Sequence, residues 1–299
     1  MTTNMRLEQV KVGDVELNLA SMGDPSKPLV ICLHGFPEYW AAWKDVMEHL
    51  AGDFHLVAPD QRGFNLSSKP AELEAYRVRR LVTDIAGLAD RLSPGRPFVL
   101  AGHDWGASVA YAYAFAYSDR VSHLVIANGV HPACFQRAIF QDPEQRRASQ
   151  YINKLRAPSA EALLSEDEYR RLFNMLAGFS KTDWMTPDVK ASYLETWRQP
   201  GALTGMLNWY RASPIIVPAP GEAAPRSPID DIDPEAMRVR MPHLVIWGEA
   251  DEALRPVCLD GLDRFASDLT VKPIAGAGHW ILHEKPAEVA NVIRGFIAD

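Results

Sequence analysis

The sequence predicts an α/β fold, in which a mostly parallel central sheet is covered by helices on both faces and a helical segment is inserted. Two observations predict it. Short apolar runs of strand length alternate with stretches of helical length over residues 29–127, and the alternation resumes over residues 243–297. Between these blocks the chain has no run typical of a strand. We therefore expect a core formed by residues 1–133 and 214–299 and a helical cap formed by residues 134–213.

Local patterns predict the individual elements. Two alternating runs at residues 7–12 and 15–20 flank Gly13-Asp14, which is typical of a β-hairpin. Apolar runs predict buried strands at residues 29–33, 55–58, 96–101, 121–127, 243–247 and 269–274. Apolar residues at helical spacing predict helices at residues 39–50, 78–92, 105–117, 166–176, 187–197, 254–265 and 287–297. Residues 214–234, which are rich in Pro, Ala and Asp, are expected to form a return loop.

Composition and charge exclude several classes of function. The chain has 299 residues, 47% of them hydrophobic, which is ample for a large core. Its net charge of −7 and its dispersed basic residues give no reason to expect a nucleic-acid partner. No apolar run is long enough to cross a bilayer, and the first residues lack the apolar region of a signal peptide. We therefore expect no membrane association.

The cysteines bear on the compartment. Cys32, Cys134 and Cys258 are odd in number, widely spaced and outside any metal-ligand motif. They are typical of structural thiols in a reducing environment, so we expect a cytoplasmic protein that needs no metal or organic cofactor. The sequence does not define an oligomeric state, although a homodimer is compatible with it.

The stretch Gly102-His103-Asp104-Trp105-Gly106 has the frame of a nucleophile elbow, G-x-S-x-G, with aspartate in place of serine. It lies between a predicted strand and a predicted helix, as this motif requires, although five residues alone would also fit an aspartate that caps a helix. A serine that attacked a saturated carbon would leave an ether, which the same site could not hydrolyse. A carboxylate leaves an alkyl ester, whose carbonyl water can still attack. Asp104 therefore predicts a substrate with an electrophilic sp3 carbon, such as an epoxide or a carbon–halogen bond.

An acid and a histidine complete the catalytic set in chain order. Asp251 and His279 each follow a predicted strand. Parallel strands bring them to the same edge of the sheet as Asp104. His279 would take a proton from water, and Asp251 would fix the tautomer of the ring and stabilise its charged form. Glu249 and Glu252 flank Asp251 and remain alternatives for its role.

The loop His34-Gly35-Phe36-Pro37 follows a predicted strand and can offer a backbone N–H to an oxyanion. We expect the oxyanion hole to consist of the N–H groups of Phe36 and of Trp105, the residue after the nucleophile. His34 and His103 adjoin strand ends and are interpreted first as structural neighbours of the site. His283 precedes a predicted helix and is expected to be a packing or surface residue.

With these residues assembled, the chain resembles the α/β-hydrolase fold family and, within it, the soluble epoxide hydrolases. The resemblance rests on HGFPE at 34–38, DQRGFNLSSKP at 60–70, GHDWGA at 102–107, NGVHP at 128–132, WRQPGALTGMLNWYRA at 197–212, WGEADEAL at 247–254 and GAGHW at 276–280. It covers nearly the whole chain. It implies hydration of an epoxide to a vicinal diol, a cis peptide bond at Phe36-Pro37, and a cap helix on which Tyr210 points at the nucleophile.

The first of the family's two cap tyrosines has no direct counterpart. When Pro158 is aligned with the family's early cap proline, Lys154 occupies the position of that tyrosine, and Tyr151 lies about one helical turn earlier. A phenol can donate to the alkoxide that forms when an epoxide opens. Tyr151 is therefore a candidate for the second donor, and the alternatives are that Tyr210 acts alone or that the chain does not open epoxides.

Dehalogenases share the aspartate elbow and form the main alternative. Haloalkane dehalogenases resemble the chain at Trp105 but usually have Asn where this chain has Phe36. Fluoroacetate dehalogenases carry arginines after the nucleophile, where this chain has Trp105 and Ser108, although a haloacid could instead be held by Lys154 or Arg156. A non-catalytic receptor of this family is disfavoured because all triad positions are filled. An esterase is disfavoured because no serine occupies the elbow.

We expect a mostly apolar pocket for a small electrophile of low to moderate polarity. Phe36 and Trp105 would contribute to its aromatic lining. The weaker candidates for this pocket are His34, Pro37, Trp40, His103, Tyr151, Lys154, Trp184 and Trp280.

Overall fold

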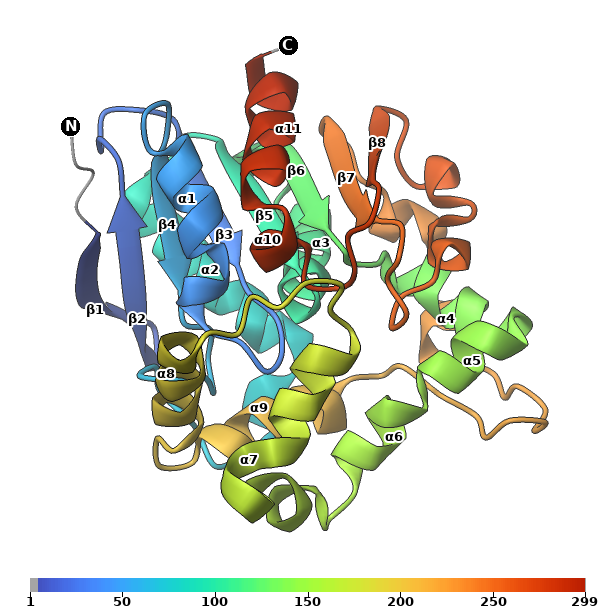
Figure 1. Ribbon diagram of the computed structural model, residues 1–299. Helices are drawn as coiled ribbons and strands as arrows, with labels where there is room; N and C mark the ends of the chain where they lie inside the picture. The colour runs from blue at the N-terminus through green and yellow to red at the C-terminus, as the bar shows by residue number, and fades with distance from the viewer. Residues whose placement is uncertain (1–4, 299) are drawn as a thin grey trace.

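The computed structural model describes residues 5–298, and its fold is the predicted α/β architecture (Figure 1). The strands form one sheet in the order β1-β2-β4-β3-β5-β6-β7-β8. The predicted hairpin pairs β1 with β2, β2 is also antiparallel to β4, and all other neighbours are parallel. The strands are β1 (Arg6–Val12), β2 (Val15–Met22), β3 (Leu29–Leu33), β4 (His55–Pro59), β5 (Phe98–His103), β6 (Val121–Ala127), β7 (His243–Gly248) and β8 (Leu269–Ile274).

Helices cover both faces of the sheet (Figure 1). One face carries α1 (Lys44–Leu50), α10 (Ile281–Glu284) and α11 (Pro286–Ala298), and the other carries α2 (Val78–Leu92) and α3 (Trp105–Ala116). Every residue of β3, β5 and β7 is buried, which explains why these strands are continuous apolar runs. Two hydrophobic clusters result, one on each side of the sheet.

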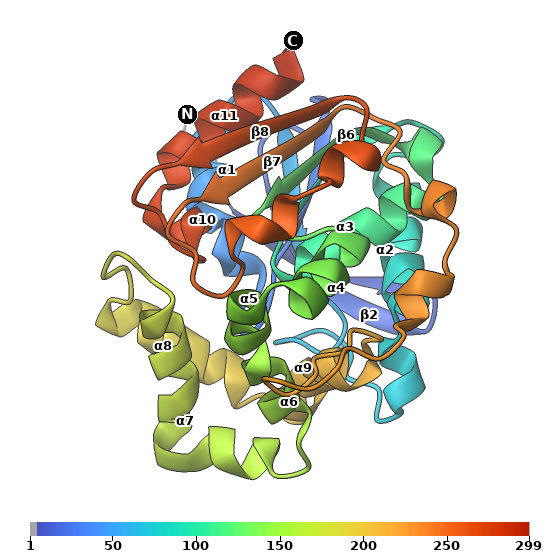
Figure 2. The same ribbon diagram turned by 90° about the vertical axis from the view of Figure 1, so that its right-hand side faces the viewer.

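The chain between β6 and β7 contains helices and no strand among its described residues. These helices are α4 (Pro132–Gln141), α5 (Pro143–Ala148), α6 (Gln150–Arg156), α7 (Ala160–Gly178), α8 (Pro187–Trp197) and α9 (Ala202–Ala212). Helices α6 to α9 lie beyond the carboxyl ends of the parallel strands (Figures 1 and 2). They therefore cover the sheet edge at which the predicted catalytic residues emerge. The division into core and cap at residues 134 and 213 stays a prediction.

One predicted helix is wrong. Residues 254–265 contain two short 3₁₀ helices, Pro256–Leu259 and Leu262–Arg264, in place of an α-helix. Gly261 separates them with a φ of 69°, in the left-handed region that ends a helix. Leu254, Cys258 and Leu262 are buried at a spacing of four residues, and this apolar pattern imitates the face of an α-helix.

The described residues bear on two further predictions. Within residues 5–298, no helix is both long enough and apolar enough to span a membrane. Cys32, Cys134 and Cys258 are free and buried. Burial raises the pKa of Cys134 to about 11, so its thiol stays protonated and packs as a small apolar group.

Candidate active site

Asp104 lies in a sharp turn between β5 and α3. Its backbone has φ 50° and ψ −119°, a strained conformation that presents the carboxylate beyond the strand end. The turn can be this tight only because its flanking residues lack side chains. A Cβ on Gly106 would lie 2.2 Å from the carbonyl oxygen of Leu33, and a Cβ on Gly102 would lie 2.6 Å from that of Gly106. This close approach explains both glycines of the motif.

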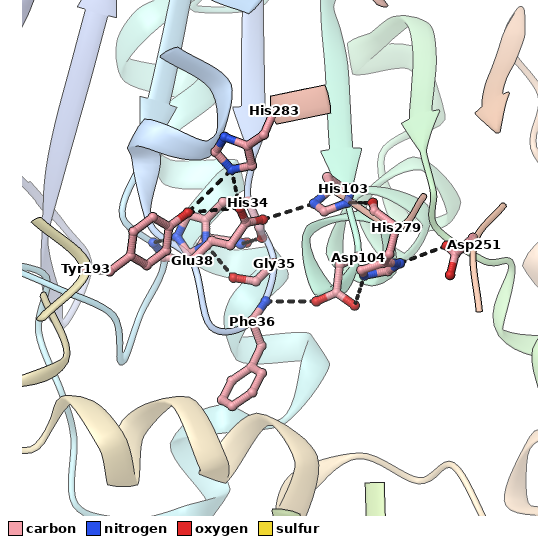
Figure 3. A network of polar contacts seen from close by, with 11 residues as sticks. His34, Gly35, Phe36, Glu38, His103, Asp104, Tyr193, Asp251, His279 and His283 are labelled. Atoms are coloured by element: carbon pink, nitrogen blue, oxygen red, sulfur yellow. Dashed lines mark hydrogen bonds and ion pairs between the residues drawn. The ribbon is translucent and has the colours of Figure 1, made fainter. Parts of the chain in front are cut away.

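His279 lies between two carboxylates (Figure 3). Its Nδ1 is 2.8 Å from Oδ2 of Asp251, and its Nε2 is 3.5 Å from Oδ2 of Asp104. The three residues predicted as acid, base and nucleophile therefore meet at the carboxyl ends of the strands. Burial opposes protonation of His279, but the two carboxylates outweigh burial and raise the pKa of the ring to about 10. The two carboxylates that the ring faces therefore favour its protonated form.

Asp251 is held by hydrogen bonds from the loop that follows it. The N–H groups of Ala253 and Leu254 donate to its Oδ1 at 2.8 and 2.9 Å. Its Oδ2 is left to face the imidazole, so the acid is oriented before the reaction starts. Glu249 is exposed, and Glu252 forms an ion pair with Lys181 of the helical segment. The contacts of these two alternatives to Asp251 therefore lie away from His279.

Asn128 belongs to the site, although the sequence analysis did not single it out. Its Nδ2 donates to Oδ2 of Asp251 at 2.6 Å, and its Oδ1 accepts the N–H of Gly248 at 2.9 Å. It follows β6 with a positive φ of 36°, which asparagine tolerates better than most residues. The available signal was its position after a strand, at the start of the motif NGVHP.

The loop after β3 supplies a hydrogen-bond donor to the nucleophile. The N–H of Phe36 donates to Oδ1 of Asp104 at 2.8 Å, and the peptide bond Phe36-Pro37 is cis. Trp105 is the first residue of α3, where a backbone N–H has no acceptor within the helix. Both N–H groups predicted for the oxyanion hole therefore flank Asp104.

Another buried carboxylate, that of Glu38, lies on the side of His103 away from Asp251 (Figure 3). Glu38 is fully buried, and its oxygens are 3.1 Å from Nδ1 of His103, 2.7 Å from Nε2 of His283 and 3.1 Å from the hydroxyl of Tyr193. Burial alone would raise the pKa of Glu38, but the hydrogen bonds from the two histidines hold it well below its usual range. The only sequence signal for Glu38 was its place at the end of HGFPE.

His103 adjoins the nucleophile in sequence, yet its ring serves this second cluster. Its Nε2 lies 2.9 Å from the carbonyl oxygen of His279 while its Nδ1 faces Glu38. His103 therefore joins β5 to the loop that carries His279, in agreement with its interpretation as a structural neighbour. His283 is more than a surface residue, because it contacts Glu38 directly.

A cavity of about 270 Å³ opens at Asp104. Trp105, Tyr151 and Tyr210 line it beside the nucleophile. The ring centroid of Tyr210 lies 5.0 Å from that of Trp105 and 6.3 Å from that of Tyr151. Burial raises the pKa of both tyrosines well above the usual value, and the charge of Asp104 adds to this effect. Both phenols therefore keep their protons at neutral pH and are available as donors.

Most of the weaker pocket candidates lie elsewhere. Lys154 is exposed on α6. Trp184 stacks on His283 with ring centroids 3.8 Å apart, and Trp280 is buried beside His279. Tyr151 alone of these candidates lines the described cavity. The residues that do not line it are His34, Pro37, Trp40, His103, Lys154, Trp184 and Trp280.

Comparisons with known proteins agree with this geometry. Residues 28–286 match the alpha/beta hydrolase fold family, so the chain belongs to that family. Within it, the chain is 32% identical to the AB hydrolase superfamily protein YfhM of Bacillus subtilis, over 98% of each chain. A structure of novel epoxide hydrolases from metagenomes of hot environments is 36% identical, with a TM-score of 0.85 over 98% of this chain and 99% of that one. The epoxide hydrolase of Bacillus megaterium in complex with an inhibitor is 30% identical, with a TM-score of 0.85 over 98% of this chain and 100% of that one.

Proposed function

We propose that the protein is an epoxide hydrolase that converts its substrate to a vicinal diol through an ester on Asp104. The observation that carries this proposal is the arrangement of groups around one carboxylate. Asp104 has a histidine 3.5 Å from one oxygen, a backbone N–H 2.8 Å from the other, and two protonated tyrosines in the cavity beside it. The chain's similarity to epoxide hydrolases supports the same reaction.

The first step uses the two oxygens of Asp104 differently. Phe36 holds Oδ1 by its N–H, so Oδ2 attacks a carbon of the oxirane. A C–O bond to the enzyme forms, the C–O bond of the ring breaks, and the electron pair passes to the departing oxygen. Tyr210 and Tyr151 donate hydrogen bonds to this oxygen and supply its proton. An alkoxide is a poor leaving group without such donors, which is why a phenol pair fits an epoxide better than a halide.

The second step depends on a change of charge. Asp104 is one of the two anions that raise the pKa of His279. Once Asp104 is esterified its charge is lost, so the pKa of His279 falls and the ring can release its proton and act as a base. It then takes a proton from water, which attacks the ester carbonyl while the N–H groups of Phe36 and Trp105 hold the oxyanion. Collapse of this intermediate breaks its bond to the alkyl oxygen, which takes the proton of the new Asp104 hydroxyl and leaves as the diol, so the carboxylate is restored. The ring keeps the proton that it took from water, and the proton that it released earlier returns through solvent to the tyrosine that had donated one.

A haloacid dehalogenase is the second candidate, and the cavity disfavours it. Such an enzyme needs a cation for the substrate carboxylate. Arg156 instead donates to the carbonyl oxygens of Tyr210 and Ser213, and Lys154 is exposed. Among the described residues that line the cavity, none is Lys or Arg. A haloacid would therefore leave its charge unpaired in an apolar site.

Intact-protein mass of a His279→Ala variant tests the proposal. Without its base, the variant should form the ester but hydrolyse it slowly, so incubation with a pool of epoxides and haloacids should add the mass of a whole epoxide. An Asp104→Asn variant is the matched control and should stay unmodified. An adduct equal to a haloacid minus hydrogen halide would favour the dehalogenase. No adduct, together with wild-type protein that is inactive on the pool, would refute the proposal.

A further inference from the structure

The cavity at Asp104 extends far along α3. Asp104, Ser108, Ala112 and Phe115 all line it, and their spacing of four, four and three residues puts them on one face of the helix. Because an α-helix rises about 1.5 Å per residue, this stripe is about 16 Å long. The reacting group of a substrate needs only the end beside Asp104. The rest of the stripe is available to a substituent.

The opposite wall comes from the segment that follows α9. Ile215, Ile229, Ile232 and Met237 of this segment line the cavity together with residues of α4. The sequence predicted only a return loop here, but the structure makes it part of the binding site. In Figure 2 the orange segment after α9 runs past α4 toward α2. Among the described lining residues, Asp104 is the only charged one.

The cavity reaches the surface at its far end. Val78, the first residue of α2, and Ile232 line the cavity and are each 44% exposed. Pro214 and Ala236, the other exposed residues of the lining, belong to the same segment as Ile232. Asp104, at the other end, has a side chain that is only 12% exposed. The mouth therefore lies between the start of α2 and the segment after α9.

We propose that the natural substrates are epoxides with an elongated, uncharged, apolar substituent that lies along α3 while the oxirane contacts Asp104. This inference rests on the proposed function and defines its substrate class. Each methylene laid along the stripe leaves water for an apolar wall, which favours binding. A charged substituent would lose its hydration without gaining a partner. Ala112, at the middle of the stripe, and Ile232, at the mouth, are the residues that set this preference.

The test compares terminal butene oxide with terminal octene oxide, which differ only in chain length. Wild-type protein should have a kcat/KM for octene oxide at least about tenfold higher, because the added methylenes are buried. Ala112→Phe should lower the ratio of the two values at least about tenfold, because the new ring fills the middle of the stripe. Ala116→Phe makes the same change at an exposed position of the same helix and should leave the ratio unchanged.

Two further measurements keep the inference falsifiable. Ile232→Glu changes an exposed side chain, so it should fold even if Ala112→Phe does not, and it should also lower the ratio by placing a charge at the mouth. Glycidate, a short epoxide with a carboxylate, should react at least about tenfold less efficiently than butene oxide. Equal efficiency for the two alkene oxides in the wild type, or an unchanged ratio in Ile232→Glu and in a folded Ala112→Phe, would overturn the inference. Failure to turn over any epoxide and to form an ester would instead refute the proposed function.

Discussion

The two oxygens of Asp104 have different partners, and in the proposed reaction this difference would separate the two steps. Oδ1 accepts the N–H of Phe36 at 2.8 Å, whereas Oδ2 lies 3.5 Å from Nε2 of His279. If Oδ2 attacks the substrate, as we propose, the attacking oxygen is also the one that pairs with His279 before the reaction. Formation of the ester would then remove this ion pair and release the base. The proposed nucleophile and base would thus be coupled through one charge.

This coupling predicts that the pKa of His279 depends on the charge of Asp104. Replacing Asp104 with Asn imitates the uncharged ester, so the pKa of His279 should fall from about 10, where Asp251 and Asp104 together hold it. NMR titration of histidine-labelled protein measures this pKa. Asp119→Asn removes an exposed carboxylate and serves as the control. An unchanged pKa in Asp104→Asn would show that the resting charge of Asp104 does not govern the base.

The proposed roles of Tyr210 and Tyr151 predict which step of the reaction slows when either hydroxyl is removed. Tyr210→Phe and Tyr151→Phe keep the ring but remove the donor, so each should slow ester formation by about 10²–10⁴-fold. Rapid quenching followed by mass measurement gives the rate of ester formation. Tyr117→Phe, at a residue that is 41% exposed, should have no effect. If Tyr151→Phe formed the ester at the wild-type rate, Tyr210 would be the sole donor.

At the scale of elements, the loop that carries His279 is attached to the helical segment above it. The N–H of His279 donates to the carbonyl oxygen of Phe179 at 3.1 Å. Glu284 of α10 accepts the N–H of Gly278 at 2.6 Å and the N–H of Lys181 at 3.0 Å. The chain between α7 and α8 and the loop before α10 therefore form one unit. The position of the base depends on contacts from both.

Replacement of Glu284 should reduce both the stability of the protein and the rate at which the ester is hydrolysed. Glu284→Gln puts an amide NH₂ where the carboxylate accepted hydrogen bonds, so a backbone N–H loses its acceptor. This should lower the free energy of unfolding by about 1–3 kcal/mol, which urea denaturation measures. Because the His279 loop is loosened, hydrolysis of the ester should slow more than its formation. Glu288→Gln, an exposed change in the next helix, should alter stability by less than about 0.5 kcal/mol. Equal behaviour of the two variants would show that Glu284 does not hold the loop.

These elements also show what the sequence could predict. The strands and the proximity of Asp104, Asp251 and His279 were predictable, because buried parallel strands are continuous apolar runs and these side chains follow them directly. Glu38 was not, because its partners His103, Tyr193 and His283 are 65, 155 and 245 positions away along the chain. The place of Tyr151 beside Tyr210 depends on how α6 packs on α9, which a local pattern does not define.

At the scale of the whole molecule, Arg62 joins parts of the fold that are distant in sequence. It follows β4, and its side chain is only 1% exposed. Nε and Nη2 donate to the two oxygens of Asp84 on α2 at 2.8 and 2.6 Å, and Nη2 also reaches Asp14 in the turn of the hairpin. Its carbonyl oxygen accepts the indole N–H of Trp209 on α9 at 2.9 Å. Sheet, helical layer and cavity wall therefore meet at one residue.

Arg62→Met should destabilise the protein by about 3–5 kcal/mol at neutral pH, because Asp84 would remain buried without its partner. Burial already raises the pKa of Asp84 although Arg62 lowers it, so removal of Arg62 should raise this pKa further. The folded variant then binds a proton more tightly than the unfolded chain does. Its stability should therefore increase as the pH falls through the raised pKa toward the pKa of the carboxyl in the unfolded chain, and it should do so more than that of the wild type.

The double variant Arg62→Met with Asp84→Asn separates charge from packing. If the unpaired carboxylate is the cause of the destabilisation, the neutral amide should recover part of the lost free energy at neutral pH and remove the added pH dependence. Denaturant unfolding at neutral and mildly acidic pH measures both quantities. A double variant as unstable as Arg62→Met at both pH values would assign the loss to the packing of the arginine itself. Arg62 would then connect the layers through its shape and its backbone contact with Trp209 rather than through its charge.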